Sequence, residues 1–358
     1  MELKSEYMRT EEKVIFALRE LYSKYGYAQF KMSKFEEYDL YVKNKDFLVS
    51  DSVITFNDTN GRLMALKPDV TLSIIKNSAE TENVQKLYYN ENVYRVSKNT
   101  HSFKEIMQTG LECIGSLDTY NICEVVTLAA KSLCAISENF VLDISHMGLI
   151  SSVLDGIDVD IKKQILQYIS EKNTHDLVAL CEKENIDSSI IVALVNVSGT
   201  SEEIKQKLAA IPFGENSKDA IEEINTVADI ITSLPENNKI HFDFSIVNDM
   251  NYYSGIVFKG YIEGIPTGIL SGGRYDLLMS KMGKKTGAIG FAVYLDFLER
   301  FMEETKEYDT DILLLYNDTD RLSEVLKTVD TLTSQGSRVL AETSVPEGLK
   351  YKTLLRFE

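Results

Sequence analysis

The sequence has no long apolar segment. Its 358 residues contain no run of eighteen apolar positions, and the first six residues, Met1-Glu2-Leu3-Lys4-Ser5-Glu6, are mostly polar. A membrane-spanning helix needs about 20 apolar residues, and a secretory signal needs an apolar core. We therefore expect a cytoplasmic protein without a membrane partner.

Positive charge is scarce as well. Lysine and arginine together number 38, against 55 aspartates and glutamates, which gives a formal net charge of −17. Proteins bind nucleic acid largely by neutralising its phosphates with lysine and arginine. The acidic balance counts against a tRNA substrate, and we expect no nucleic-acid partner.

Motifs for metals, disulfides and nucleotides are missing too. No cysteines have C-x-x-C spacing and no histidines have zinc-ligand spacing, so we expect buried reduced thiols and no metal. Gly283-Lys284-Lys285-Thr286 resembles the end of a phosphate-binding loop, but it lacks the spaced first glycine and the hydroxyl residue after Gly-Lys. Ser271-Gly272-Gly273 lacks the third glycine of a dinucleotide fingerprint. We expect no cofactor.

The first part of the chain has patterns typical of helices and paired strands. Thr10 is expected to cap a helix that ends at Gly26, because apolar residues recur between them at helical spacing. Asn60-Gly61 indicates a β-hairpin. Leu87–Val96 and Lys104–Gly115 are expected to form two long strands joined by a polar loop. These elements predict an antiparallel sheet with helices packed on it.

The rest of the chain divides into three parts. Residues from about 148 to 236 have helical patterns throughout, which predicts a helical insertion within a core that spans residues 1–308. Strands resume after the insertion, and Ala288–Met302 has a helical pattern. Residues 309–358 have the strand–helix–strand order of a small, truncated C-terminal α/β unit. The predicted fold class is therefore α+β.

One predicted strand carries polar side chains on a single face. Residues two apart in a strand face the same side, so Gln108, Gly110 and Glu112 share a face. A glycine between two polar side chains leaves room for a ligand against the backbone. A carboxylate and an amide suit a ligand that carries an ammonium group or ring N–H donors. The alternative is a solvated polar face of the sheet.

Other polar residues are candidates for the same site. Asp69 and Thr71 lie near a predicted helix start, where the alternative role is capping. Tyr252 and Tyr253 enter a strand, so we expect one ring in the core and one hydroxyl available to a ligand. Tyr275 follows two glycines and offers another hydroxyl.

These segments, in their order along the chain, resemble the catalytic core of histidyl-tRNA synthetase, a class II aminoacyl-tRNA synthetase fold, over roughly residues 5–305. The resemblance implies that Asp69, Thr71 and Gln108 hold the α-amino group of histidine. It also implies that Arg95 approaches the carboxylate or a phosphate. The segments that carry the resemblance are Leu66–Thr71, Tyr94-Arg95, Gln108–Gly115, Asn251–Phe258, Gly272–Asp276 and Gly287–Ala292.

The resemblance places three further residues around the imidazole ring of histidine. They are Glu112, Tyr253 and Tyr275, whose carboxyl and hydroxyl groups would answer the ring nitrogens. The shared strand face of Gln108 and Glu112 agrees with this assignment. Core residues without a ligand are the alternative.

Three positions depart from the synthetase pattern. Asn248 and Phe297 stand where the family has arginines, and positioned arginines stabilise the charge that builds on the α-phosphate during adenylate formation. Tyr294 stands where a glycine gives space. The C-terminal unit is about half the length of an anticodon-binding domain. The resemblance therefore implies that ATP chemistry and tRNA reading are both compromised.

A chain that keeps the pocket and loses the chemistry resembles the regulatory subunit of ATP phosphoribosyltransferase, a partner in histidine biosynthesis built on a synthetase core. This resemblance implies a homodimer without catalytic activity that joins a short catalytic subunit in a hetero-octamer. It also implies activation of that subunit and feedback inhibition by free histidine. A divergent active histidyl-tRNA synthetase and a histidine-binding module for another partner are the alternatives.

Overall fold

The computed structural model divides the chain into two compact units, Met1–Met302 and Glu303–Glu358. Asn248 lies outside the residues that the structure describes. Within the described part of the chain, no helix combines the length and the apolar character needed to cross a membrane. The described residues are 8–44, 53–79, 83–97, 100–247, 252–301, 307–317 and 321–357.

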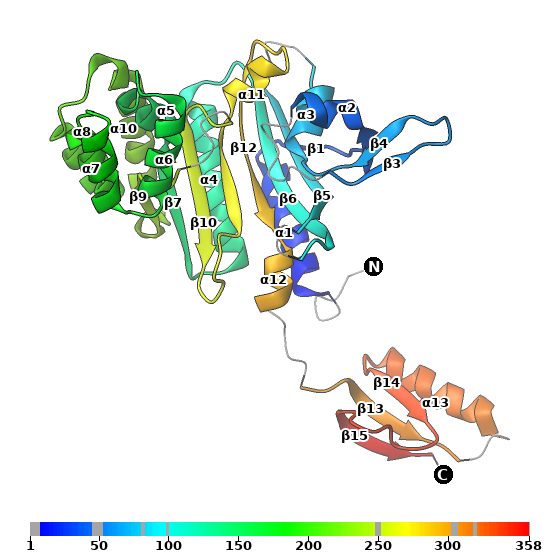
Figure 1. Cartoon of the computed structure of the whole chain (residues 1–358). Coiled ribbons are helices and arrows are strands. Elements are labelled where there is room, and N and C mark those ends of the chain that lie inside the picture. The colour runs from blue at the N-terminus through cyan, green and yellow to red at the C-terminus, as the bar shows by residue number, and fades with distance from the viewer. Residues whose placement is uncertain are drawn as a thin grey trace. The chain divides into compact units, whose positions relative to one another are not determined.

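The first unit is built on a nine-stranded sheet (Figure 1). Six neighbouring strands pair antiparallel, and their spatial order is β5, β6, β12, β11, β10 and β7. β1 pairs parallel with β5, and β9 pairs parallel with β7. The mainly antiparallel sheet confirms the predicted α+β fold. The order across the sheet is β1 (Ala28–Gln29), β5 (Gln85–Val96), β6 (Phe103–Gly115), β12 (Gly287–Tyr294), β11 (Leu270–Arg274), β10 (Ile256–Ile262), β7 (Phe140–His146), β9 (Ile240–Asp243) and β8 (Ser198–Gly199).

Two separate hydrophobic cores form on the sheet. The first core includes buried residues of α1 (Thr10–Lys24) and α4 (Thr119–Ile136). The second core includes buried residues of α3 (Thr71–Asn77) and α11 (Asp276–Lys281). Adjacent residues at the end of β6 enter different cores, Cys113 the first and Ile114 the second. This alternation confirms the predicted assignment of β6 residues to opposite faces.

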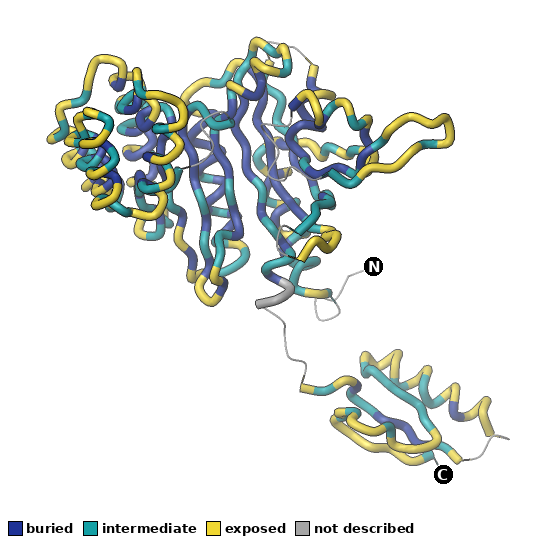
Figure 2. The backbone as a smooth tube through the Cα atoms, viewed as in Figure 1, coloured by how far each residue is buried: buried dark blue, intermediate teal, exposed yellow. Residues whose placement is uncertain are grey.

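A small sheet and a short helix border the second core. The hairpin predicted at Asn60-Gly61 is confirmed, because β3 and β4 pair antiparallel on either side of it. Its tip is exposed (Figure 2). The elements are β2 (Phe35–Glu37), β4 (Leu63–Leu66), β3 (Thr55–Asn57) and α2 (Tyr38–Lys43).

The helical insertion follows β7 in the chain and lies beside the end of the sheet that contains β7 and β9 (Figure 1). Its buried apolar residues, such as Ile165, Leu177 and Ile224, belong to the first core, whereas its outer surface is exposed (Figure 2). The helices are α5 (Met147–Val153), α6 (Val159–Ser170), α7 (Thr174–Lys183), α8 (Ser189–Val195), α9 (Ser201–Ala209) and α10 (Lys218–Thr232), with short 3₁₀ turns at Glu215–Ser217 and Asn237–Lys239.

The second unit has a three-stranded parallel sheet with one helix. Its strand–helix–strand start confirms the predicted α/β order, and the third strand was not predicted. The strands in spatial order are β14 (Val339–Glu342), β13 (Thr310–Leu315) and β15 (Tyr351–Arg356), and the helix is α13 (Leu322–Ser334).

Two sequence predictions about helices are wrong. The helix predicted over Ala288–Met302 is strand β12 up to Tyr294, and only Asp296–Phe301 forms a helix, α12. A strand inside a sheet that is covered on both faces has a continuous apolar run, which periodicity alone does not separate from a helix. Thr10 is the first residue of α1 rather than its cap, and the Arg9 backbone N–H donates to Glu12 Oε2 at 2.9 Å.

Candidate ligand-binding site

Glu112 lies at the centre of a buried polar cluster. Its Oε1 accepts a hydrogen bond from Thr71 Oγ1 at 3.0 Å, and its Oε2 accepts one from the Tyr275 hydroxyl at 2.5 Å. Glu112 is 2% exposed. Gly290 on β12 gives this carboxyl its space, because a side chain at that position would overlap Oε2. The cluster therefore joins the start of α3, the strand β6 and the turn after β11.

The environment of Glu112 shifts its protonation equilibrium. Burial raises the pKa of Glu112, the hydrogen bonds from Tyr275 and Thr71 lower it, and the charge of Asp69 raises it, so that the pKa is about 8. With this pKa the carboxyl is mostly protonated at neutral pH. A ligand with an ammonium or imidazolium group would favour the ionised carboxylate. The cluster is therefore suited to a cationic ligand group.

Asp69 and Arg95 lie at the edge of this cluster. Asp69 precedes the N-cap residue Val70, and its Oδ1 accepts a hydrogen bond from the Leu72 N–H at 2.9 Å, so it satisfies an N–H of the first turn of α3. Thr71 does not, because its hydroxyl bonds Glu112 instead. Burial raises the pKa of Asp69, whereas the hydrogen bond from Leu72 and the charge of Arg95 lower it. Arg95 is thus a nearby cation for an otherwise acidic site.

Protein groups already hold the Arg95 guanidinium. Its Nε donates to the Pro68 carbonyl at 3.0 Å. Burial raises the pKa of Tyr294, and the charge of Arg95 and a hydrogen bond between the two side chains lower it. Arg95 is therefore fixed in place beside Tyr294.

Gln108 places an amide on the same face of β6 as Glu112. The side chain is 3% exposed, and its Nε2 has no hydrogen-bond partner within the described residues. A buried polar group without a partner costs about 1–3 kcal/mol. The amide can present its N–H to a carboxylate or, after rotation, its oxygen to an ammonium group. This open hydrogen-bonding position points to a polar ligand.

Two expectations, about the directions of Tyr252 and Tyr253 and about the space over Gly110, are wrong. Tyr252 and Tyr253 do not point to opposite sides: their ring centroids lie 4.6 Å apart, and both pack against the second core, although Tyr253 also contacts the first. They precede β10 instead of lying in it, so strand alternation does not apply. The space expected over Gly110 is not left for a ligand, because the Tyr89 hydroxyl occupies it.

Tyr252, which is not among the predicted binding residues, also lies next to Tyr275. Its ring centroid lies 5.9 Å from that of Tyr275. Burial raises the pKa of Tyr252 and of Tyr253, whereas Thr71 lowers that of Tyr252 and Ser271 lowers that of Tyr253. The only sequence signal was the adjacency of the two tyrosines, which does not tell which ring lies closer to Thr71.

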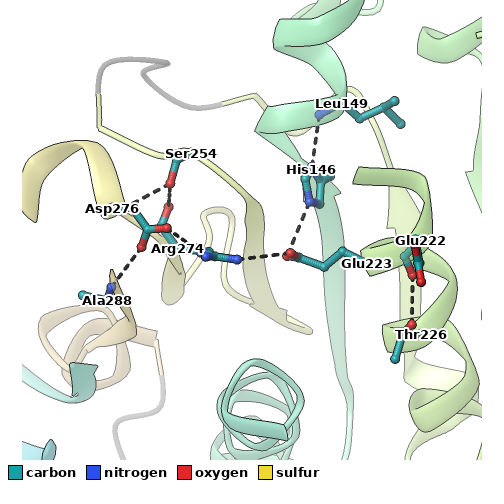
Figure 3. A network of polar contacts seen from close by, with 9 residues as sticks. All are labelled: His146, Leu149, Glu222, Glu223, Thr226, Ser254, Arg274, Asp276 and Ala288. Carbon is teal, nitrogen blue, oxygen red and sulfur yellow. Dashed lines mark hydrogen bonds and ion pairs between the residues drawn. The ribbon is translucent and has the colours of Figure 1, made fainter. Parts of the chain in front are cut away.

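Arg274, next to Tyr275, links this region to the helical insertion (Figure 3). Its Nε donates to Asp276 Oδ2 at 2.7 Å, and its Nη1 donates to Glu223 Oε2 on α10 at 3.2 Å. His146 Nε2 lies 3.4 Å from Glu223 Oε1. These contacts fix the turn that presents Tyr275 to Glu112. Glu223 and Arg274 are 51 positions apart, and no local pattern indicates their pairing.

Phe297 lies in an aromatic environment. It stands at one of the two positions where the synthetases have an arginine. Its ring centroid is 6.4 Å from that of Tyr294, and it packs against the first core. Neither side chain supplies a positive charge for a phosphate. The structure therefore brings Thr71, Glu112 and Tyr275 into one bonded cluster, with no cation at position 297.

Comparison with known proteins decides the family. A family model described as histidyl-tRNA synthetase matches residues 1–298. The chain belongs to the histidyl-tRNA synthetase family. Its curated relatives include proteins named ATP phosphoribosyltransferase regulatory subunit. That of Alkaliphilus metalliredigens is 29% identical over 89% of this chain and 84% of the relative. That of Clostridium kluyveri is 29% identical over 84% of this chain and 81% of the relative.

Solved structures of this family share the fold. An ATP phosphoribosyltransferase regulatory subunit/histidyl-tRNA synthetase from Bacillus halodurans has a TM-score of 0.76 and 23% identity, over 97% of this chain and 93% of its own. Histidyl-tRNA synthetase from Nostoc sp. PCC 7120 has a TM-score of 0.72 and 18% identity, over 97% and 87%. The ATP phosphoribosyl transferase (HisG:HisZ) complex from Thermotoga maritima has a TM-score of 0.64 and 19% identity, over 79% and 96%. The predicted class II synthetase-like fold is confirmed.

Proposed function

We propose that this chain is a non-catalytic regulatory subunit of ATP phosphoribosyltransferase, which acts in the first step of histidine biosynthesis. It joins a short catalytic subunit, activates it and makes it sensitive to inhibition by free histidine. The names of the curated relatives and the likeness to a chain of the Thermotoga maritima complex support this assignment. The observation that carries the histidine-sensing part is the buried Glu112 cluster, together with the Gln108 Nε2 on the same strand face, which has no hydrogen-bond partner among the described residues.

Histidine matches the groups of this cluster. The imidazole supplies ring N–H donors for the Glu112 carboxylate, and the aromatic rings of Tyr252 and Tyr253 give it an apolar surface. The α-ammonium group suits the negative charge of Asp69. The α-carboxylate suits the positive charge of Arg95 and the N–H of Gln108. All three polar parts of the amino acid thus meet a complementary group.

The same region offers little to adenylate formation. That reaction builds charge on an α-phosphate, which needs positioned cations. Phe297 carries no charge at a position where the family has an arginine. We therefore assign the pocket to binding and not to catalysis.

Regulation follows if histidine binds one state of the assembly more tightly than another. A ligand shifts such an equilibrium only by its difference in affinity between the states. We propose that histidine favours an inhibited state of a hetero-octamer built from dimers of this chain, and that the substrates of the catalytic subunit favour an active one.

Calorimetry on the purified chain tests the pocket. We expect saturable binding of histidine and much weaker binding of histamine, which lacks the α-carboxylate, and of glutamine, which lacks the imidazole. Equal affinity for all three compounds, or no histidine binding, would contradict the proposal. Size-exclusion chromatography with the short catalytic subunit tests the partner, for which we expect co-elution.

A further inference from the structure

A recess outside the Glu112 cluster is lined by several basic residues, although the chain as a whole is acidic. Its volume is about 590 Å³, and it lies where β6 ends, β12 begins and the chain turns after β11. Its lining includes Arg274, Lys284 and Lys285, against a single acidic residue, Asp276. Because Arg274 is ion-paired with Asp276 and Glu223, the charge left for a ligand comes mainly from the two lysines.

We propose that this recess binds a phosphate-bearing anion. Its volume falls within the range of about 300–1,000 Å³ that is common for small-molecule sites. Hydroxyl groups of Ser116, Ser280 and Thr286 also line it and supply hydrogen-bond donors. Charge-assisted hydrogen bonds from lysine and arginine are strong and suit phosphate oxygens.

Arg274 is held in place before any ligand arrives (Figure 3). Asp276 binds its Nε and Glu223 binds its Nη1, so the guanidinium has a fixed orientation. The acidic partner Asp276 is itself satisfied: its Oδ2 accepts from Arg274 at 2.7 Å, and its Oδ1 accepts from the Ala288 N–H at 3.0 Å. A pre-oriented donor lowers the entropy cost of binding.

The two lysines carry charge that the described residues do not neutralise. Lys284 Nζ donates to the Ser78 carbonyl at 2.8 Å, which is a neutral acceptor. Lys285 is exposed and forms no ion pair with a described residue. Both belong to Gly283-Lys284-Lys285-Thr286, a segment that fails as a nucleotide-binding loop by sequence but lines the recess in the fold.

The recess is distinct from the proposed histidine pocket. Tyr275 directs its hydroxyl to Glu112, whereas the preceding residue, Arg274, lines the recess. Neither lysine belongs to the Glu112 cluster. The two sites therefore have separate side chains and opposite charge preference, and either one can fail a test without the other.

Calorimetric titration of the full chain with inorganic diphosphate tests this inference. We expect one saturable site per chain, weaker at high ionic strength because charge dominates the interaction. The variant Lys284→Ala/Lys285→Ala should lose at least about tenfold in affinity. Lys285→Ala alone should lose part of this affinity. The Lys285 side chain is exposed, so the substitution preserves folding. Lys163→Ala, which removes an exposed lysine from α6, is the matched control and should bind as the wild type does.

The outcomes separate clearly. Absence of saturable diphosphate binding to the wild-type chain would overturn the inference, as would equal losses in the Lys163→Ala control. Sulfate that binds as tightly as diphosphate would show that the recess does not select phosphate. Glu112→Gln should weaken histidine binding and leave diphosphate binding unchanged, which keeps this test independent of the proposed function.

Discussion

The Tyr275 hydroxyl donates a hydrogen bond of 2.5 Å to Glu112 Oε2, although 163 positions separate the two residues. Burial raises the pKa of Tyr275 well above its usual value, and ionisation of Glu112 raises it further, so the phenol remains a donor throughout the physiological range. The bond connects β6 to the turn that also carries Arg274. A ligand that changes the ionisation of Glu112 therefore acts directly on this turn.

Removal of the Glu112 carboxyl should weaken histidine binding. Glu112→Ala leaves a ligand N–H donor without a partner in a buried site, at a cost of about 1–3 kcal/mol. At about 1.4 kcal/mol per tenfold change, calorimetry should show a loss of roughly 5- to 150-fold. Glu202→Ala, at an exposed position of α9, should bind histidine normally. Unchanged affinity in Glu112→Ala would place the pocket elsewhere.

The stability of the chain should depend on pH through Glu112. Its pKa is about 8 in the folded protein and near 4.5 when unfolded, so the folded state binds more protons between these values. Stability is then greatest below about pH 4.5 for this group and falls as pH rises toward 8. Glu112→Gln removes this contribution. Urea unfolding across this range should show that the free energy of unfolding of Glu112→Gln increases relative to that of the wild type as pH rises. A difference that does not change with pH would contradict the raised pKa of Glu112.

The chain should form no histidyl adenylate. Phe297 and Asn248 supply no cation for the α-phosphate, and Tyr294 stands where the family has a glycine. The double variant Asn248→Arg/Phe297→Arg should also remain inactive, because Tyr294 still fills its position. The assay is pyrophosphate exchange that depends on both ATP and histidine. Exchange above background in the wild-type chain would show an active synthetase.

Histidine sensing should separate from activation. In the complex with the short catalytic subunit, Tyr275→Phe and Asp69→Asn should raise the histidine concentration needed for inhibition and leave turnover without histidine nearly unchanged. Asp69→Asn keeps an oxygen that accepts the Leu72 N–H, so this hydrogen bond to the first turn of α3 is preserved. Tyr168→Phe on α6 is a control for the loss of a phenol. Equal loss of activation and inhibition would mean that the variants disturb assembly.

The sequence predicts local features of the site better than its long-range contacts. Strand alternation correctly placed Gln108 and Glu112 on one face of β6, because that period depends only on the backbone. The position of Tyr252 beside Tyr275 was not predicted, because residues 252–254 precede the strand. Strand β12 was read as a helix because both of its faces are buried. The Arg274–Glu223 pair arises from the packing of the insertion, which no local pattern encodes.

Turnover of the short catalytic subunit of ATP phosphoribosyltransferase, measured with and without this chain and then with histidine, tests the central claim most directly. We predict that the purified chain co-elutes with the catalytic subunit, raises its rate of ATP- and PRPP-dependent turnover and makes that rate sensitive to histidine. Tyr275→Phe should keep the rate increase and lose much of the sensitivity. No co-elution and no change in rate would contradict the regulatory-subunit account and favour a histidine-binding module for another partner.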